Sequence, residues 1–588
     1  MKHCFYPAMP GPISHSRRQF VQGLAAGSVL AGLGMFSLPA WAARPTELSG
    51  REFDLTISEL PVNFTGWPAL ATAVNGQIPG PVLRWREGDT VTIRVTNRLR
   101  VPTSIHWHGI VLPTEMDGVP GLSFDGIAPG ETFVYRFRVG QSGTFWYHSH
   151  SGFQEQTGVY GAIVIEPRTA VPRLREHVLM LSDWSDEDPA RVYAKLKTFD
   201  GYFNYVKPTL GDLRQQAQQQ GWGQAWQQRM MWDRMRMSPR DLADVSGATY
   251  TFLANGTPPA GNWTALFDDG EQVQLRIINA AAMSYFDLRI PGLKMTVVAA
   301  DGQPVHPVTV DEFRIGVAET YDVIVTPESG NAYTIFAQAL DRSGYARATL
   351  APRPGMSAAV PALDPVPTLT MADMGMPTHD AMHMEKPAPA MAQHTMPGMA
   401  MGAMPMEQPA PSYTMQVRHH PATEHGPGNA MQAQVVSTRL DDPGAGLRNN
   451  GRRVLTYADL HSLDGVLNPQ EPARTIELHL TGNMARYMWS FDGVKFSDAG
   501  PLRLTYGERV RIVLVNDTMM EHPIHLHGMW SELENPQGVA QLRKHTVSVK
   551  PGHAVSYRVL ADARGRWAYH CHLMYHMNAG MFREVEVA

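Results

Sequence analysis

Cysteine is nearly absent from this sequence, which has only Cys4 and Cys571 among its 588 residues. Cys4 lies in an N-terminal segment that we expect to be removed, so the mature chain would keep one cysteine and no internal disulfide. That is unusual for an exported protein, because disulfides are common outside the cytosol. A lone thiol between two histidines, His570 and His572, is more typical of a thiolate metal ligand.

A strong charge of one sign is missing as well. The formal net charge is -5 at pH 7 and charged residues make up 18% of the chain, which gives no reason to expect nucleic acid or an anionic membrane surface as a partner. Hydrophobic residues make up 43%, enough for ordinary cores in the three or four domains that this length favours. Beyond the N-terminus no segment is apolar enough to span a bilayer, so we expect no stable membrane anchor.

The N-terminus has the pattern of an export signal. The pair Arg17-Arg18 precedes an apolar run over residues 21–38, and residues 40–42 offer a small-x-small cleavage site. We therefore predict a twin-arginine signal peptide over residues 1–42, the twin-arginine export machinery as a partner, and a periplasmic location. A short membrane anchor is the alternative, but the run is rich in Gly and Ala.

One sequence pattern occurs three times, over residues 88–97, 270–279 and 507–516. Each copy begins with Gly, ends with Asn and alternates apolar with polar residues, which is the period of a half-buried strand. A second element is shared by residues 143–148 and 565–570. Short strands separated by Gly and Pro turns favour β-sandwiches.

We predict an all-β chain of three related domains, with boundaries near 45–168, 172–355 and 412–588. Two segments break the pattern. Residues 210–245 are rich in Gln, Met, Trp and Arg and are expected to form one or two helices inserted in the middle domain, with their methionines in the core or on the helix surface. Residues 356–411 are rich in Pro, Ala and Met and are expected to be a disordered linker.

Histidines follow the first and third copies of the repeat but not the middle one, which has apolar residues at those positions. They sort into four motifs: His106-Trp107-His108, His148-Ser149-His150, His522-Pro523-Ile524-His525-Leu526-His527, and a C-terminal group of His570, Cys571, His572, His576 and Met581. Residues i and i+2 of a strand point to the same face, so each His-x-His pair aims two imidazoles into one cleft. Four pairs bring eight nitrogens together from two domains.

Cys571 points to the face opposite His570 and His572 and therefore needs a metal site of its own. His522, His576 and Met581 are its natural companions, because two imidazoles, one thiolate and a weak thioether make a blue-copper electron-transfer site. The bonds from Cys571 to its neighbours give an electron a short route to the other cluster. The spacing thus predicts that one-electron donors are oxidised at one site and oxygen is reduced at the other.

The four motifs resemble those of the multicopper oxidase family of laccases, ascorbate oxidase and bacterial cuprous oxidases, and the resemblance covers essentially the whole mature chain. It implies three cupredoxin-like Greek-key β-sandwiches, molecular oxygen as acceptor, and four copper ions, one type 1, one type 2 and a type 3 pair. It also implies the ligands: His522, Cys571, His576 and Met581 for type 1; His106 and His525 for type 2; His108, His148 and His572 for one type 3 ion; His150, His527 and His570 for the other.

The family also has an acid that handles protons where this chain has Asp117. Asp117 precedes Gly118, so an ordinary turn aspartate is an equal alternative. Cuprous oxidases of the family often have a second acid just after the last type 1 histidine, and this chain has Met577 there, which leaves the proton route on that side open.

The methionines favour copper itself as the substrate. Eleven lie between Met371 and Met406, with His379, His383 and His394 among them, and thioethers favour Cu(I). Together with residues 284–292 and 311–314 and the signal peptide, they resemble the copper-resistance protein A subfamily of multicopper oxidases. This predicts a cuprous oxidase in copper resistance. Two alternatives remain: a periplasmic copper-sequestering protein with incidental oxidase activity, and a laccase acting on phenols. A copper nitrite reductase is a weaker rival, because such enzymes lack paired type 3 ligands.

Overall fold

The computed structural model describes residues 46–169, 172–376, 416–417, 420, 422–426, 428–463, 465 and 469–588. The expected signal peptide and Cys4 lie outside these residues, as does most of the methionine-rich segment. None of the described helices is long and apolar enough to cross a bilayer.

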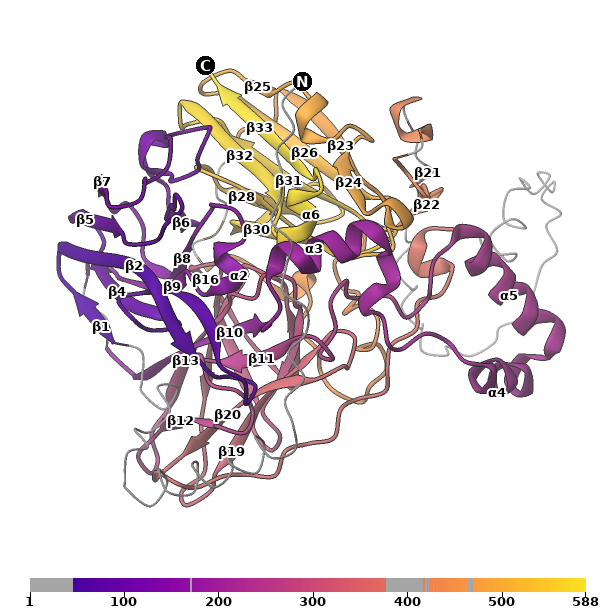
Figure 1. The fold of residues 1–588 in the computed structure, drawn as a ribbon, viewed down its shortest axis with the longest axis horizontal. Helices are drawn as coiled ribbons and strands as arrows, with labels where there is room; N and C mark the ends of the chain where they lie inside the picture. The colour runs from indigo at the N-terminus through magenta and orange to yellow at the C-terminus, as the bar shows by residue number, and fades with distance from the viewer. Residues whose placement is uncertain are drawn as a thin grey trace, which may run out of the picture. The chain divides into compact units, whose positions relative to one another are not determined.

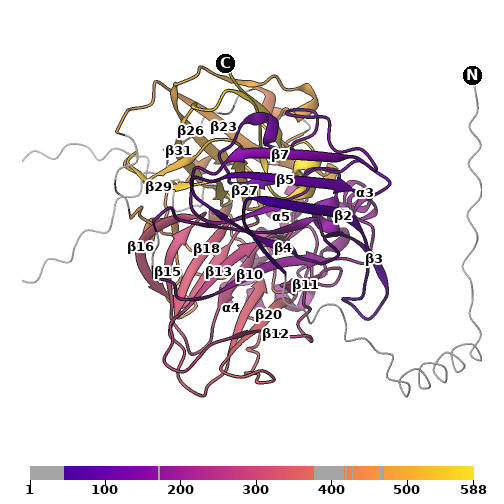
Figure 2. The same cartoon turned by 90° about the vertical axis from the view of Figure 1, so that its left-hand side faces the viewer.

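The described chain is built from three pairs of β-sheets, seen in Figure 1 as indigo, pink and yellow regions. The first pair has the strand orders β1-β4-β9-β8-β6 and β3-β2-β5-β7, the second β11-β10-β13-β18-β15-β16 and β12-β20-β19-β14-β17, and the third β24-β23-β26-β31-β28-β29 and β25-β33-β32-β27-β30. A separate small sheet pairs β21 (Gln416–Val417) with β22 (Val435–Val436). The strands of the first pair are β1 (Glu47–Ser49), β2 (Glu52–Val62), β3 (Ala69–Val74), β4 (Gly80–Arg86), β5 (Thr90–Asn97), β6 (His106–His108), β7 (Thr132–Arg138), β8 (Gly143–His148) and β9 (Tyr160–Glu166). Those of the second are β10 (Arg175–Trp184), β11 (Thr251–Ala254), β12 (Trp263–Leu266), β13 (Val273–Asn279), β14 (Phe286–Arg289), β15 (Met295–Ala300), β16 (Gln303–Val310), β17 (Glu312–Ile315), β18 (Thr320–Val325), β19 (Tyr333–Ala339) and β20 (Tyr345–Ala351). Those of the third are β23 (Arg474–Asn483), β24 (Met488–Phe491), β25 (Leu502–Leu504), β26 (Arg509–Asn516), β27 (His522–Leu526), β28 (Ser531–Glu534), β29 (Ala540–Lys544), β30 (Thr546–Val549), β31 (Ala554–Leu560), β32 (Gly565–Cys571) and β33 (Phe582–Val587). In Figure 2 the strands β2, β5 and β7 of the first domain face the viewer. The predicted all-β fold of three sandwiches is confirmed.

The threefold sequence pattern forms the same strand in each domain: β5 (Thr90–Asn97), β13 (Val273–Asn279) and β26 (Arg509–Asn516). On one side each of these strands has a parallel neighbour, which is β2 (Glu52–Val62) for β5, β10 (Arg175–Trp184) for β13 and β23 (Arg474–Asn483) for β26. On the other side each has an antiparallel neighbour, which is β7 (Thr132–Arg138), β18 (Thr320–Val325) and β31 (Ala554–Leu560), respectively. The alternating apolar residues point into the cores: Val91, Ile93 and Val95 are fully buried in β5.

The asparagine that ends each copy fastens the turn that follows it. All three side chains are buried, and each amide Nδ2 donates to two backbone oxygens: Asn97 to Val101 (2.9 Å) and Ile127 (2.8 Å), Asn279 to Ser284 (2.9 Å) and Ile315 (3.1 Å), and Asn516 to Met520 (2.7 Å) and Val549 (2.8 Å). In the third domain this clamp lies directly before His522. Leaving a buried amide without its hydrogen bonds costs free energy. The asparagine therefore keeps the segment that leads to the histidine strands in one conformation.

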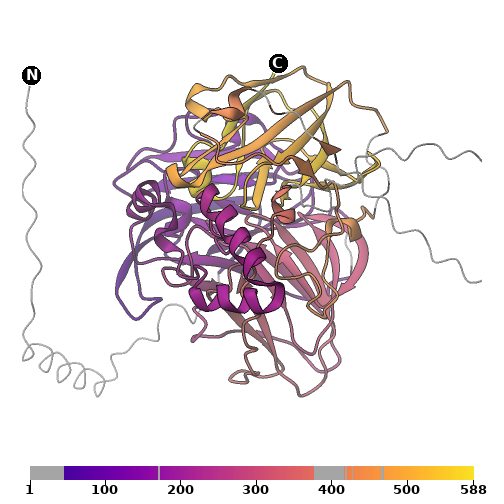
Figure 3. The ribbon, with the colours of Figure 1, turned by 90° about the vertical axis from the view of Figure 1, so that its right-hand side faces the viewer.

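Helices are inserted in the middle domain, as predicted. They are α4 (Leu210–Gln220) and α5 (Trp222–Met235), the magenta helices nearest the viewer in Figure 3. Thr209 and Asp212 form a capping box that starts α4. Met230 and Met231 are each 37% exposed, so they lie on the helix surface. A further helix, α3 (Pro189–Thr198), begins at the cap Asp188 and was not predicted.

Residues 356–376, at the start of the segment expected to be a linker, pack against the rest of the protein. Met374 is fully buried and Leu369 is 4% exposed. The carboxylate of Asp364 pairs with Arg289 of the middle domain at 3.0 Å. The ion pair and the two buried apolar side chains attach this stretch to the rest of the protein, which its composition did not indicate. The remainder of the expected linker, from residue 377, lies outside the described residues.

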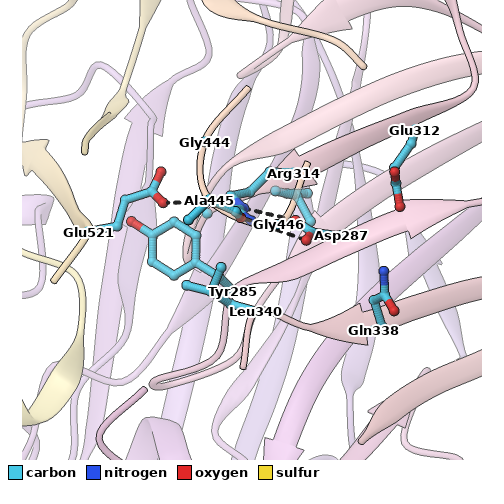
Figure 4. Close-up of polar contacts among 12 residues, drawn as sticks. Tyr285, Asp287, Glu312, Arg314, Gln338, Leu340, Gly444, Ala445, Gly446 and Glu521 are labelled. Atoms are coloured by element: carbon cyan, nitrogen blue, oxygen red, sulfur yellow. Dashed lines mark hydrogen bonds and ion pairs between the residues drawn. The ribbon is translucent and has the colours of Figure 1, made fainter. Parts of the chain in front are cut away.

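A buried ion-pair network joins the middle domain to the third (Figure 4). Asp287 in β14 (Phe286–Arg289) accepts from Arg314 in β17 (Glu312–Ile315) at 2.8 and 3.1 Å, and it also pairs with Arg342 at 2.7 Å. Arg314 reaches Glu521, the residue before His522, at 3.2 Å. Two carboxylates lower the cost of burying Arg314 and hold the pKa of its guanidinium above the ordinary value.

Asp287→Ala is therefore expected to lower the free energy of unfolding by about 3–5 kcal/mol, because it leaves two buried arginines short of a counter-charge. Urea unfolding of the variant measures this. Glu586→Ala is the matched control: it removes the exposed pair with Arg503, which is 79% exposed, and should cost less than about 1 kcal/mol. A loss no larger for Asp287→Ala than for the control would show that the network contributes little.

Candidate metal centre

Two pairs of adjacent strands carry the histidine motifs. In the first domain β6 (His106–His108) pairs with β8 (Gly143–His148), which puts His106 opposite His148. In the third domain β27 (His522–Leu526) pairs with β32 (Gly565–Cys571), which puts His525 opposite His570. The two domains thus present matching histidine strands to one another.

The imidazoles of the four His-x-His motifs meet between these strands. Three Nε2–Nε2 separations are short: His148 to His572 (3.3 Å), His150 to His570 (3.3 Å) and His527 to His570 (3.1 Å). The ring of His106 stacks on that of His527, and the ring of His108 stacks on that of His525, with centroids 3.9 and 3.8 Å apart. All eight rings are buried, apart from the partly buried His150.

Hydrogen bonds at the outer nitrogens decide which nitrogen of each ring faces the centre. The Nδ1 atoms of His148, His527 and His570 face oxygen acceptors, respectively Ser149 O (3.0 Å), Asp117 Oδ2 (2.8 Å) and Cys571 O (3.0 Å). With the proton on Nδ1, each Nε2 carries a lone pair. Lone pairs 3.1–3.3 Å apart do not bond to each other and need a cation between them.

Four more ring nitrogens of the cluster lack any hydrogen-bond partner among the described residues. They are Nε2 of His106, Nε2 of His525, Nδ1 of His108 and Nδ1 of His572, and all four are buried. An unpaired buried acceptor is costly, and a metal ion would satisfy it. Imidazole-rich sites suit copper, so this donor set fits a cluster of copper ions.

Cys571 lies on the other face of β32, as its position between two histidines predicted. Its Sγ is 3.5 Å from Nδ1 of His522 and 3.9 Å from Nδ1 of His576, and these two nitrogens are 3.2 Å apart. Met581 is fully buried, and its backbone oxygen accepts from the Cys571 amide at 3.1 Å. Burial raises the pKa of the thiol, so a bound metal ion would have to displace its proton. The thiolate and two imidazoles fit a copper site.

The outer nitrogens of these two histidines are also held. Thr518 Oγ1 lies 2.7 Å from His522 Nε2, and Asp244 Oδ2 lies 2.6 Å from His576 Nε2. Tyr487 donates to the same Asp244 oxygen at 2.7 Å. A carboxylate in this place fixes the ring orientation and makes the ligand more basic.

Two acids contact the histidine cluster. Asp117 follows the short helix η2 (Thr114–Met116), and its side chain is 1% exposed. Its Oδ2 accepts from His527, and its backbone oxygen accepts from Nδ1 of His106 at 2.8 Å. Asp117 is therefore both a residue of the turn before Gly118 and a partner of two candidate ligands.

Glu155, in the short helix α2 (Gln154–Thr157), is the second acid. Its Oε2 lies 3.0 Å from His148 Nδ1, and its Oε1 lies 3.8 Å from His572 Nδ1. Burial, together with the nearby Asp183, raises the pKa of Glu155 well above its ordinary value.

A series of buried charged residues reaches the cluster at His108. Nδ1 of His545 is 3.1 Å from His108 Nε2, and the amide of His545 donates to Asp301. Lys544 pairs with Asp301 at 3.0 Å and with Glu319 at 3.1 Å. Burial alone would lower the pKa of Lys544, but the two carboxylates hold it above its ordinary value. The middle domain, which lacks histidines at the repeat positions, thus helps to orient His108.

Profiles of the multicopper oxidase family match three stretches of the chain, residues 56–170, 175–355 and 469–588. Together they cover more than half of its length. The chain belongs to the multicopper oxidase family. It is therefore a copper-dependent oxidoreductase.

Several curated relatives are similar over nearly the whole chain. A copper resistance protein A homolog of Pseudomonas syringae pv. tomato is 60% identical, with 98% of this chain and 100% of that protein covered. A copper resistance protein A of Escherichia coli is 56% identical, with 97% and 99% covered. The multicopper oxidase MmcO of Mycobacterium tuberculosis is 30% identical, with 96% and 95% covered. The predicted resemblance to the copper-resistance protein A subfamily is confirmed.

Solved structures support the fold. The laccase from Botrytis aclada matches with a TM-score of 0.61 at 21% identity, covering 93% of this chain and 89% of that one. Fet3p, described as a multicopper oxidase that functions in iron import, matches with a TM-score of 0.60 at 19% identity, covering 92% and 90%.

The structure brings together the histidines and Cys571 that the sequence pointed to. It adds Asp244, Glu155 and His545, which the sequence did not indicate. Asp244 lies 332 positions from His576 along the chain, at the end of the helical insertion. His545 lies 437 positions from His108. No local spacing connects such pairs. For Glu155 the one available signal was its position five residues after His150.

The metal-free protein is expected to lose stability as the pH falls below about 6.5. Burial lowers the pKa of eight candidate ligands well below the ordinary value or, for His570, to about 4; the other seven are His108, His148, His150, His522, His525, His527 and His572. Below pH 6.5 the unfolded chain binds protons that the folded chain does not, so unfolding becomes more favourable. A histidine like His570 contributes on the order of 2 kcal/mol between pH 6.5 and 5.

Denaturant unfolding of metal-free protein between pH 8 and pH 5 measures this dependence. Metal-free protein with His148→Gln and His572→Gln is the control: its unfolding should vary less over the same range, because two fewer groups take up protons on unfolding. Equal pH dependence in the two samples would show that these buried histidines do not cause it.

Proposed function

We propose that this protein is an oxidase that couples one-electron oxidation of a donor, with Cu(I) favoured, to the four-electron reduction of molecular oxygen to water. The observation that carries the proposal is the geometry of β32. Cys571 faces His522 and His576 on one side of this strand, while its neighbours His570 and His572 face the histidine cluster on the other.

We infer four copper ions with the ligands that the family resemblance implies. His522, Cys571, His576 and Met581 would hold the type 1 ion; His106 and His525 the type 2 ion; His108, His148 and His572 one type 3 ion; and His150, His527 and His570 the other. Copper bound in these sites supplies one-electron redox chemistry on one side of β32 and oxygen binding on the other.

The residues of the chain direct electrons and protons between these sites. The covalent bonds from Cys571 to His570 and His572 would give an electron from a copper ion held by the thiolate a short route to the histidine cluster. Asp117 holds the outer nitrogens of His106 and His527 through its backbone and side-chain oxygens, and we assign to its carboxylate the handling of protons for oxygen reduction. Met577 occupies the position where related cuprous oxidases have a second acid.

Two observations support Cu(I) as the donor. Relatives that are 56–60% identical are named for copper resistance. Eleven methionines lie between Met371 and Met406, and thioethers are soft ligands that suit Cu(I). We infer a role in copper resistance, in the periplasm after twin-arginine export of residues 1–42.

A phenol is the second candidate donor, because a cavity of about 680 Å³ lies beside the helical insertion. Its lining includes Phe199, Trp232, Met237 and Arg236. That volume and this mixture of aromatic and polar groups suit a small aromatic ligand. Copper sequestration with incidental oxidase activity is the remaining alternative.

Cys571→Ser should abolish oxygen uptake with both Cu(I) and a phenol, since it removes the thiolate that passes electrons to the cluster. An oxygen electrode with fully copper-loaded samples measures the effect. If the copper-loaded wild-type protein itself consumed no oxygen on addition of either donor, the sequestration alternative would hold instead.

Replacing eight methionines by leucine tests the donor. The positions are Met382, Met384, Met391, Met396, Met399, Met401, Met404 and Met406; the buried Met374 stays. Leucine keeps the volume and removes the thioether. Cuprous oxidation should fall at least several-fold while phenol oxidation persists. Equal loss of both activities would count against a role of these methionines in Cu(I) capture. The matched control is Met230→Leu with Met231→Leu on α5, which should leave both activities unchanged.

A further inference from the structure

Two histidines and two carboxylates gather in the third domain, outside the copper motifs. His479 lies in β23, and Asp517 directly follows the parallel strand β26. His420 and Glu424 come from the segment that contains the short helix η6 (Ala422–His425). The side chains of Glu424 and Asp517 are fully buried, that of His479 is 4% exposed, and that of His420 is 9% exposed.

The inner atoms of these four side chains converge. Nδ1 of His420 is 2.7 Å from Glu424 Oε2 and 3.6 Å from Asp517 Oδ2. Nδ1 of His479 is 2.6 Å from Asp517 Oδ2 and 3.4 Å from Glu424 Oε2. The Nδ1 atom of each imidazole thus faces both carboxylates.

The outer atoms have the partners that metal ligands need. Nε2 of His420 donates to the backbone oxygen of Ala433 at 3.0 Å, and Nε2 of His479 lies 3.3 Å from a carboxylate oxygen of Glu477. Asp517 Oδ1 accepts from the amide of Ala433 at 2.7 Å. Ligating histidines almost always donate their second ring N–H to a carbonyl or carboxylate, and ligating carboxylates are themselves hydrogen-bonded.

One atom of the group is left over. Glu424 Oε1 is buried and has no hydrogen-bond partner among the described residues. Two buried carboxylates therefore face the Nδ1 atom of each histidine, and one buried oxygen lacks a partner. A cation bound between these four side chains would satisfy that oxygen.

We propose that His420, Glu424, His479 and Asp517 form a mononuclear site for a divalent first-row metal ion, with Cu(II) as the ion that its chemistry favours. Two imidazoles and two carboxylates suit Cu(II) or Zn(II), whereas thioethers suit Cu(I). Among divalent ions, Cu(II) binds most tightly to such donors. The site therefore differs from the methionine-rich segment in the oxidation state that it selects.

The distances fit such an ion. Adjacent ligands at about 2.0–2.2 Å lie about 2.8–3.1 Å apart around a tetragonal Cu(II) ion and about 3.3–3.6 Å apart around a tetrahedral Zn(II) ion. The four cross distances are 2.6, 2.7, 3.4 and 3.6 Å, so shifts of at most roughly 0.7 Å would admit either ion when it replaces the shared protons.

The supply of Cu(II) to the site rests on the proposed cuprous oxidation, which would release Cu(II) as its product; the existence of the site does not. His420 follows the last methionine of the segment, Met406, by fourteen residues. Asp517 precedes Thr518, whose hydroxyl lies 2.7 Å from Nε2 of His522. The site thus lies between the methionine-rich segment and the thiolate site along the chain.

Equilibrium dialysis of the copper-loaded full chain against Zn(II), followed by metal counting, tests the site. We expect His479→Gln and Glu424→Gln each to bind one zinc ion per chain fewer than wild type. His425→Gln is the matched control, because His425 lies on the same short helix and contacts Gln432 outside the cluster. It should bind as wild type does.

A second experiment uses Cu(II) in place of Zn(II). It distinguishes a site for the Cu(II) product of the oxidation from a site that accepts any divalent ion. Wild type should show one additional Cu(II) signal in electron paramagnetic resonance, and both variants should lack it. The same uptake is expected in Cys571→Ser, so failure of the oxidase proposal would leave this result unchanged. No additional ion in wild type, or equal uptake in wild type and both variants, would mean that the four residues are an ion-pair network only.

Discussion

The alternation of side chains along β32 is the constraint on which the function of this molecule depends. Consecutive residues of a strand point to opposite faces, so Cys571 cannot share a site with His570 and His572. The antiparallel register with β27 places Ile524 opposite Cys571 and His525 opposite His570, which brings the second strand's histidines to the same two faces. Two candidate metal sites with different ligand sets therefore lie on opposite faces of this strand.

The three-domain scaffold holds that strand against a partner. The clamp made by Asn516 fixes the turn before β27, and the equivalent clamp of Asn97 fixes the approach to β6. The middle domain repeats the clamp at Asn279 without histidines and contributes charges instead. Asp301 and Glu319 fix Lys544 beside His545, and Asp287 with Arg314 reaches the residue before His522. The middle domain, which has none of the candidate metal ligands, thereby helps to orient those of the first and third domains.

The sequence was sufficient to predict whatever depends on local periodicity. Strand alternation and the His-x-His spacing predicted the three sandwiches and the convergence of the histidines, and composition predicted the helical insertion. It could not reveal pairings between elements far apart in the chain. Asp244 meets His576 because the insertion folds back onto the third domain, and residues 356–376 are ordered by Asp364 and Met374 although their composition resembles a linker. The four-residue site around His479 was missed for the same reason, since its members come from three separate segments.

The stoichiometry of oxygen uptake tests the central claim most directly. Anaerobic Cu(I) is added in known amounts to air-equilibrated, fully copper-loaded protein, and oxygen and hydrogen peroxide are both measured. Four-electron reduction predicts one oxygen molecule consumed for every four Cu(I) ions, without peroxide. One oxygen molecule for every two Cu(I) ions with peroxide released, or no uptake at all, would contradict the coupling of the two sites through β32.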